Sequence, residues 1–282
     1  MRYVVLLLSV IVSLSSLAQN KGQIPFIRHL VNGGYYKEAI FLMEKDKAVY
    51  SAQQQDSLHY YNGWAHYSLK NLQESTSSFL KVSDTSPFFQ KSFFFAGYNQ
   101  TYLGNYGEAK SILTKINIKK EPELLLYNFE LSGIEMLEGN WSEAKEYLDL
   151  VPEENAVLNR QVHALNEIWK DHEEHREKSP FVAGIMSAIV PGSGKIYAGK
   201  TGAGIASMIG NIGFGLITWE NYRKSGIADA KTIIFGSIFA VNYVSNIYGS
   251  VVSVKVVENE YENTIHNQIL FQLHIPLRNF FD

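Results

Sequence analysis

The chain has 282 residues, enough for two modest domains, and its formal net charge at pH 7 is −3. This near-neutral balance lacks the basic excess that binds nucleic acid, so we expect no nucleic-acid partner. The sequence contains no cysteine, which excludes disulfides, thiol catalysis and thiolate metal sites. The stability of the chain must therefore come from packing.

The amino terminus has the pattern of a secretory signal peptide. Arg2 precedes the apolar run VVLLLSVIVSLSSLA, and Ser16, Leu17 and Ala18 form the small-x-small end that is typical of a cleavage site. We expect residues 1–18 to be removed and the rest of the chain to leave the cytoplasm. The alternative is an uncleaved membrane anchor.

Four similar stretches, GGYYKEAIFLM, KNLQESTSSFL, GNYGEAKSIL and GNWSEAKEYL, follow one another between residues 25 and 152. In each stretch a small residue follows an acidic one, at Ala39, Ser75, Ala109 and Ala144. The steps between these small residues are 36, 34 and 35 positions. A period near 34 is typical of solenoids built from helix-turn-helix units.

At these positions the chain resembles the tetratricopeptide-repeat family. The family's other small, apolar and proline positions are matched by Gly63, Gly97 and Ser132, by Met43, Phe79, Leu113 and Leu148, and by Pro87, Pro122 and Pro152. The resemblance covers residues 25–152 and implies about four helix pairs. We expect one more helix within 153–178 to cap the last repeat, which completes a repeat domain over 19–178.

The resemblance places function on the inner, concave wall, which is lined in this family by the first helix of each pair. That wall would carry seven aromatic side chains: Tyr60, Trp64, Tyr67, Phe94, Tyr98, Tyr102 and Phe129. Large rigid rings dominate binding energy, so we expect a groove that binds an extended or helical peptide of a partner protein. The alternative is that the rings pack inside the array, because an error of one residue in register would turn them inward.

The stretch VPGSGKIYAGKTGAG contains the nucleotide-binding P-loop pattern G-x-x-x-x-G-K-[ST], with Gly194, Gly199, Lys200 and Thr201 at its fixed positions. A P-loop domain needs a parallel sheet of several strand and helix units, whereas only 81 residues follow Thr201. The bulky Ile196 also stands where the backbone would have to wrap around phosphate. We therefore expect no nucleotide to bind.

The same stretch resembles a motif of small bacterial membrane domains with two transmembrane helices, PG-x-G-Q-x-Y-x-G followed by a basic residue and a glycine. The matching residues are Pro191, Gly192, Gly194, Tyr197, Gly199, Lys200 and Gly202, and Lys195 stands where that motif has glutamine. These domains are mostly uncharacterised, so the resemblance implies location more than activity. We expect Pro191 to end a short apolar helix over 181–190 that lies in the membrane interface, with Tyr197 at the headgroup level.

Two uncharged stretches follow, 201–219 and 232–254, and each has close to the roughly 20 residues that cross a bilayer. Their glycines would weaken a helix in water, but in lipid they let helix backbones touch. The loop between the stretches is basic, which agrees with a cytoplasmic position. The last segment, TIHNQILFQLHIPLRNFFD, shows no clear period. We expect a membrane domain over 179–282, formed by an interfacial helix, two spanning helices and a short tail, with a buried hairpin in water as the alternative.

These features predict an all-α protein, in which a tetratricopeptide-like solenoid with a capping helix precedes a helical membrane hairpin. The spacing of His172 and His175 departs from H-E-x-x-H, and no catalytic arrangement is evident, so we expect no enzyme activity, cofactor or metal. We expect an exported protein of the bacterial inner membrane, whose periplasmic repeats gather partner proteins for cell-envelope assembly or secretion. The alternative is a structural subunit of a membrane complex or homo-oligomer, which assembles through the glycine-rich hairpin while the repeats are accessory.

Overall fold

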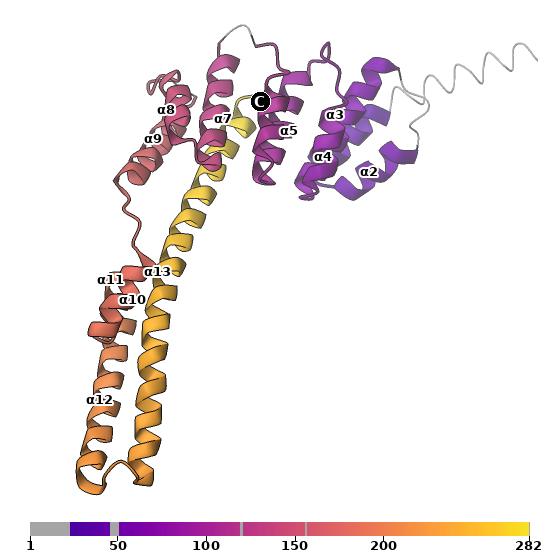
Figure 1. The fold of residues 1–282 in the computed structure, drawn as a ribbon. Helices are drawn as coiled ribbons and strands as arrows, with labels where there is room; N and C mark the ends of the chain where they lie inside the picture. Colours follow the sequence, from indigo (N-terminus) through magenta and orange to yellow (C-terminus); the bar gives the residue numbers. More distant parts are fainter. Residues whose placement is uncertain (1–22, 46–50, 119–120, 156, 282) are drawn as a thin grey trace, which may run out of the picture. The chain divides into compact units, whose positions relative to one another are not determined.

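Figure 1 shows the computed structural model, which describes residues 23–45, 51–118, 121–155 and 157–281. Every regular element within these ranges is a helix, so the predicted all-α class is confirmed for the described part of the chain. The expected signal peptide, residues 1–18, lies outside the described residues.

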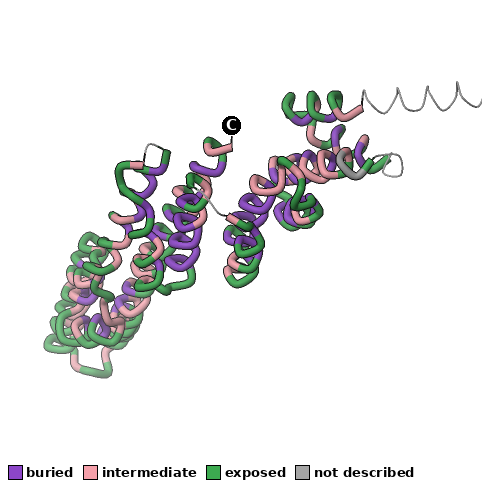
Figure 2. The backbone as a smooth tube through the Cα atoms, turned by 90° about the horizontal axis from the view of Figure 1, so that it is seen from above, coloured by how far each residue is buried: buried purple, intermediate pink, exposed green. Residues whose placement is uncertain are grey.

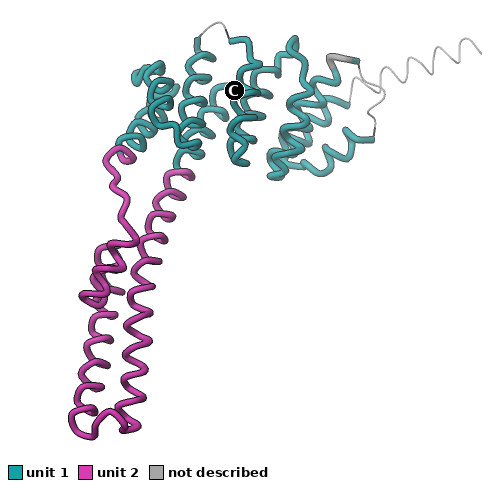
Figure 3. The backbone as a smooth tube through the Cα atoms, viewed as in Figure 1, with its two compact units in different colours: residues 1–170, 268–282 teal, residues 171–267 magenta. Residues whose placement is uncertain are grey.

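The chain forms two compact units, which Figure 3 draws in different colours. The first unit comprises residues 1–170 and 268–282, and the second comprises residues 171–267. The expected membrane domain, 179–282, therefore differs from the second unit at both ends. Its expected tail belongs to the first unit, because the tail has an apolar helical face that is buried there.

The first unit begins with a helix over residues 23–32. It continues with α2 (Tyr36–Lys45), α3 (Ala52–Ser68), α4 (Leu72–Phe79), α5 (Phe89–Tyr102), α6 (Tyr106–Leu113), α7 (Glu123–Glu138), α8 (Trp141–Asp149) and α9 (Asn159–Glu174). Three pairs pack within themselves, α3 with α4, α5 with α6 and α7 with α8, and consecutive pairs meet through α4 with α5 and α6 with α7.

The paired helices are joined by turns that need a left-handed residue. Gly104 and Gly139 take φ values of 79° and 88°, and Lys70 takes the equivalent position with φ 65°. The lysine that departs from the glycine series in the sequence therefore keeps the same backbone conformation. The amides of the two residues that end each turn donate back into the preceding helix, as in a Schellman motif: the Asn71 amide, for example, bonds the His66 carbonyl at 2.9 Å.

The small residues of the repeat lie where two helices approach most closely. Ala39, Ser75, Ala109 and Ala144 are all fully buried. A Cβ atom on Gly63 would lie 2.5 Å from the ring of Phe79, so a larger residue cannot be accommodated without a shift. The repeat positions read from the sequence are therefore the contact points between helices.

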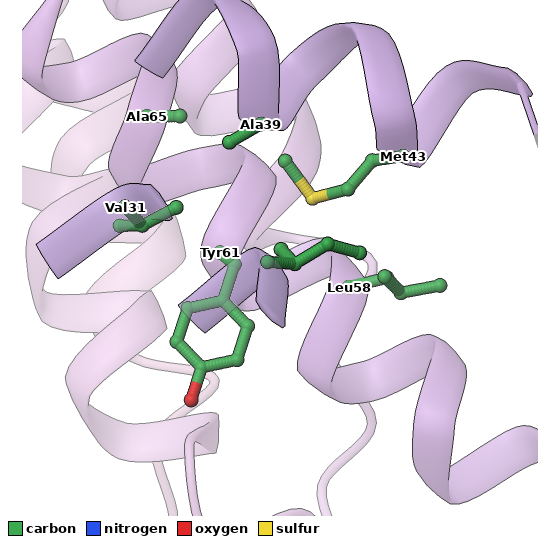
Figure 4. Packing of buried hydrophobic residues seen from close by; sticks show 7 residues of the cluster. Val31, Ala39, Met43, Leu58, Tyr61 and Ala65 are labelled. Carbon is green, nitrogen blue, oxygen red and sulfur yellow. The ribbon is translucent and has the colours of Figure 1, made fainter. Parts of the chain in front are cut away.

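Buried residues are concentrated along α5 and α7, as Figure 2 shows for the backbone. At the amino-terminal end of the unit, the first helices bury a separate cluster, whose members Val31, Ala39, Met43, Leu58, Tyr61 and Ala65 are drawn in Figure 4. The middle helices bury side chains on more than one face, which a two-layer array of helix pairs does not by itself require. An additional element must cover them.

The second unit contains α10 (Pro180–Ile189), α11 (Ser193–Tyr197), α12 (Thr201–Ser225) and most of α13 (Ala230–Asn279), which continues into the first unit. The short helix expected over 181–190 corresponds to α10, which ends at Ile189 just before Pro191. Among the described residues, α12 alone is long and apolar enough to cross a membrane by length and composition. The second expected span, 232–254, lies inside α13 and does not meet the same measure.

Candidate functional site

The element that covers the middle helices is the end of the chain itself. We call residues 268–281 the carboxyl-terminal segment, and the faces of α3, α5 and α7 that meet it the inner wall. In Figure 1 the end of α13 runs beside α7 toward α5. The segment buries Ile269, Leu273 and Leu277, each 1 % exposed or less. Their spacing of four residues places them on one face of the helix, so that face forms the contact.

Each helix of the inner wall contacts the segment through a residue that faces it. Tyr67 on α3 bonds His274 through its hydroxyl and the ring Nε2. On α5, the ring of Tyr98 stacks on His274, with 5.1 Å between ring centroids. Gly133 on α7 leaves room for Leu273, because a Cβ atom there would collide with the leucine side chain. The segment thus contacts all three helices of the inner wall.

The side chains of Tyr67, Tyr98 and His274, which contact one another at the centre of the site, are uncharged at neutral pH. Burial lowers the pKa of His274, and the positive charges of Arg278 and Lys70 lower it further. Burial raises the pKa of Tyr67 and of Tyr98. A neutral imidazole carries one ring proton, so either the Tyr67 hydroxyl donates to a bare Nε2 or a protonated Nε2 donates to the hydroxyl, according to the tautomer. The contact is therefore a neutral hydrogen bond enclosed by aromatic rings.

A carboxyl group also lies in this wall. Glu130 on α7 is 1 % exposed, and its Oε1 has no hydrogen-bond partner among the described residues. Burial raises its pKa well above the ordinary value, which favours the protonated form of the group in the folded chain. Its charge, when present, acts on both Tyr67 and Tyr98, which places it beside them.

The seven aromatic residues predicted to line the groove have three different environments. Tyr67, Phe94 and Tyr98 face the carboxyl-terminal segment, and the ring of Phe94 is 5.7 Å from that of Phe281. In this conformation the chain's own helix contacts these three residues, and the binding of a partner protein at them stays a prediction.

The other four have different environments. Tyr60 stacks on Phe88 at 4.3 Å between centroids, and Trp64 meets the ring of Phe95 edge-on at 4.9 Å. Phe129 is fully buried, whereas Tyr102 is 58 % exposed. For Tyr60, Trp64 and Phe129, the alternative of packing inside the array describes the structure better.

The residues that sequence reasoning missed are Glu130, Gly133, Leu273 and His274. A signal existed for the segment, because Ile269, Leu273 and Leu277 repeat every fourth position. Other apolar residues between them, Leu270, Phe271 and Ile275, hide this period. No local pattern marks Glu130 or Gly133 as facing a helix from the far end of the chain.

In the second unit, the glycine motif forms a tightly packed corner between α10, α11 and α12. Gly192 takes φ 89° at the start of α11, and a Cβ atom there would collide with the carbonyl of Gly204. A Cβ atom on Gly194 would collide with the carbonyl of Ala183 in α10. These glycines allow a short helix to contact two others, and this is where backbones touch, rather than between the two expected spans.

The remaining motif residues have separate positions. Pro191 follows Val190, the residue that caps the end of α10. Gly199 takes φ 90°, and Lys200 directly precedes the first turn of α12. A Cβ atom on Gly202 would meet no other group within 4 Å. The hydroxyl of Tyr197 accepts a hydrogen bond from the Ser179 amide at 3.2 Å. Lys195 donates to Ser207 at 2.6 Å.

The backbone amides of the P-loop-like stretch donate within the chain. The Gly194 amide bonds the Ser187 hydroxyl at 2.9 Å, and the Lys200 amide bonds the Lys195 carbonyl at 2.9 Å. In a P-loop such amides point at the phosphate groups. Here they are used to hold the corner together.

The histidines of the linker also have a structural environment. His175 contacts Glu258 at 2.7 Å and stacks on the ring of Tyr261, 3.7 Å between centroids. The described residues contain no group of three or more potential ligands that could hold a metal ion.

Comparison with known proteins found no family model, no curated protein and no solved structure that matches this chain.

Proposed function

We propose that this protein is a membrane-attached scaffold whose helix pairs form a tetratricopeptide-like solenoid and bind helical protein segments on the inner wall. The observation that carries the proposal is the contact of Tyr67, Phe94 and Tyr98 with the carboxyl-terminal segment. A wall that accommodates one helix along its length has the shape and the side chains to accommodate another, which is the helix-in-groove mode of recognition.

The packing of the first unit supports a solenoid. Helices pack in consecutive pairs, and each pair meets the next through its second helix. The small residues at the period of the repeat are fully buried, at Ala39, Ser75, Ala109 and Ala144. In such arrays each unit contacts its neighbours, and the inner surface remains for a ligand.

The composition of α12 supports attachment to a membrane. Large apolar side chains on α12 and at the start of α13 are exposed in this chain: Ile205, Ile209, Leu216, Val241 and Val244. Apolar surface of this extent is costly in water and favourable in lipid. With the export signal read from residues 1–18, the proposed location is the bacterial inner membrane, with the repeats in the periplasm.

The test places a photoreactive phenylalanine analogue on the inner wall of the full-length chain in intact cells. Tyr98 is the test position, and Phe41, which is aromatic and 67 % exposed on α2, is the control. A second background carries Leu273→Asp, which should release the carboxyl-terminal segment. The unaltered background should give crosslinks within the chain at position 98, and the second should give crosslinks to another protein at 98 but not at 41. If position 98 captures no other protein in either background, the wall is structural and the scaffold proposal fails.

A second candidate, a subunit that assembles through its membrane helices, is favoured by one face of α12. Cβ atoms on Gly202, Gly210 and Gly213 would meet no group within 4 Å, so these glycines do no packing within the chain. With the exposed Ala206, Gly202 and Gly210 form the small-x-x-x-small spacing that lets membrane helices associate. Crosslinked oligomers of the full chain in membranes should disappear with Gly210→Leu if this face is an interface, and unchanged oligomers would reject it.

A further inference from the structure

His274 lies at the contact between the carboxyl-terminal segment and the inner wall, and its ring is partly buried there. The Tyr67 hydroxyl on α3 contacts the ring at Nε2, and the Tyr98 ring on α5 stacks on it with 5.1 Å between centroids. A proton gained by this ring therefore places a positive charge inside the contact that holds the segment.

The charges around His274 oppose a further positive charge. Arg278 follows four positions later on the same helix, which places it on the same face. The ammonium of Lys70, just after α3, lies 5.8 Å from the centre of the Tyr67 ring. Burial lowers the pKa of His274, and these two cations lower it further. The docked ring is thus held in its neutral form.

No acidic group of the contact offsets the charge of a protonated ring. Among the described residues, no carboxylate forms an ion pair with His274. Glu130 on α7 acts on the hydroxyls of Tyr67 and Tyr98, but burial raises its pKa, which favours its neutral form. Acid removes whatever negative charge remains on that carboxyl, so it gives His274 less support as the pH falls.

We propose that His274 is a pH-sensitive switch, which releases the carboxyl-terminal segment from the inner wall when the ring gains a proton. This inference rests on the proposed scaffold function and names its regulation: the segment covers the inner wall at neutral pH and leaves it open to partner helices in acid. The release itself needs no partner, so it is tested separately from the scaffold function.

The direction of the pH effect follows from the two environments of the ring. In the docked segment the ring favours its neutral form, whereas in a released segment it is surrounded by water and titrates near its ordinary value of 6.5. Docking is therefore independent of pH above that value and weakens as the pH falls below it. One proton changes the docking equilibrium by at most about tenfold for each pH unit.

The helix of the segment needs the wall to remain regular. Pro276 lies inside α13, where it has no amide to donate to the carbonyl one turn earlier. The buried contacts of Ile269, Leu273 and Leu277 hold this weakened turn against the wall. When these contacts are lost, the backbone amides of the segment should exchange with solvent.

Hydrogen exchange of the full-length chain in detergent measures this release even when the released form is rare. The amides of residues 268–281 are followed from about pH 5 to about pH 7.5, and each rate is divided by that of an unstructured peptide with the same sequence. Their protection should fall by up to about tenfold per pH unit below 6.5. The amides of α2, at the amino-terminal end of the unit, report whether the whole unit unfolds instead.

Three variants separate the switch from a general effect of acid. His274→Asn is neutral at every pH and should give the segment a protection that stays constant below pH 6.5. His266→Asn is the matched control, since it removes an exposed histidine two turns earlier on α13 and should behave as the unaltered chain. Lys70→Gln removes one opposing cation and should reduce the loss of protection in acid.

Equal protection of the segment at both ends of this pH range in the unaltered chain would overturn the proposal. A loss that persists in His274→Asn would also overturn it, because another group would then be its source. The same holds for a loss that α2 shares, which would be unfolding of the unit. None of these results involves a partner, so the photocrosslinking at Tyr98 decides independently whether the scaffold proposal survives.

Discussion

The two compact units bury their helices in different ways. In the first, small residues at a regular period bring helices together around aromatic and aliphatic side chains, and a segment from the far end of the chain covers the remaining face. In the second, only the corner of α10, α11 and α12 is tightly packed, and α12 exposes most of its apolar surface. The first unit covers its apolar side chains with its own helices, whereas α12 in the second unit leaves large apolar side chains exposed.

The largest loss of stability is expected from a substitution where the carboxyl-terminal segment meets the inner wall. Leu273→Ala should lower the free energy of unfolding of the first unit by about 2–5 kcal/mol, because it removes a fully buried side chain from a close contact. Phe271→Ala, at a position that is 61 % exposed on the same helix, is the control and should change little. Chemical unfolding in detergent measures both, and equal effects would show that the segment is not part of the core.

The contact points of the repeat should tolerate no added atoms. Gly63→Ala should destabilise the first unit by about 1–3 kcal/mol, because the new Cβ atom would lie 2.5 Å from the Phe79 ring. Gly107→Ala is the matched control, since a Cβ atom there would meet nothing within 4 Å. That change should stabilise α6 by up to about 1 kcal/mol, because alanine favours a helix. A loss at Gly107 as large as that at Gly63 would contradict the assigned packing.

In the second unit, glycine-to-alanine changes should lower stability only where α10, α11 and α12 meet. Gly204→Ala should lower its melting temperature, since a Cβ atom would lie 2.5 Å from Ile196 and 2.7 Å from the Gly192 carbonyl. The cost should be about 1–3 kcal/mol. Gly202→Ala, two positions earlier on the same helix, meets open space and should be tolerated. If both changes are tolerated, the motif glycines have another role than packing.

Two buried groups of the inner wall should make the first unit's stability depend on pH in opposite directions. Burial lowers the pKa of His274, so the unfolded chain binds its proton first, and stability is lost as the pH falls below 6.5. Burial raises the pKa of Glu130, so the folded chain holds a proton that the unfolded chain releases, and stability is lost as the pH rises above 4.5.

Variants separate these two contributions. His274→Asn should remove the loss on the acid side of pH 6.5, and Glu130→Gln should raise the melting temperature at pH 7 by an amount that shrinks toward pH 4.5. Melting temperatures measured from pH 4 to 8 check both. A Glu130→Gln variant that is less stable at pH 7 would show that the carboxyl has a partner in the folded chain.

The smallest effect is expected at Lys70, whose φ of 65° is unfavourable for a residue with a side chain. Lys70→Gly should stabilise the turn after α3 by about 1 kcal/mol. Part of that gain is offset because the ammonium lies 5.8 Å from the centre of the Tyr67 ring. Gly104→Lys is the reverse control and should lower the stability by a similar amount. Differential scanning calorimetry of the two variants measures both changes.

The sequence predicts much of the local structure. The spacing of Ala39, Ser75, Ala109 and Ala144 predicts the positions where helices meet, because small residues are needed wherever two backbones approach. Turn residues predict where paired helices join, and Pro191 predicts the end of α10. The repeat shows itself by its regular period, and the turns and the end of α10 depend on residues close together in the chain, so the sequence pattern is sufficient to reveal each of them.

Only the tertiary structure determined what covers the inner wall. The bonds of Tyr67 with His274 and of Tyr98 with Leu270 join residues 207 and 172 positions apart. Periodicity reports which face of a helix is apolar but not which distant face will meet it. Tyr98 would have the same sequence pattern if it bound another protein, and Glu130 the same pattern if it were solvated. Their roles depend on one helix returning from the end of the chain, because burial and pairing are properties of the assembled contact.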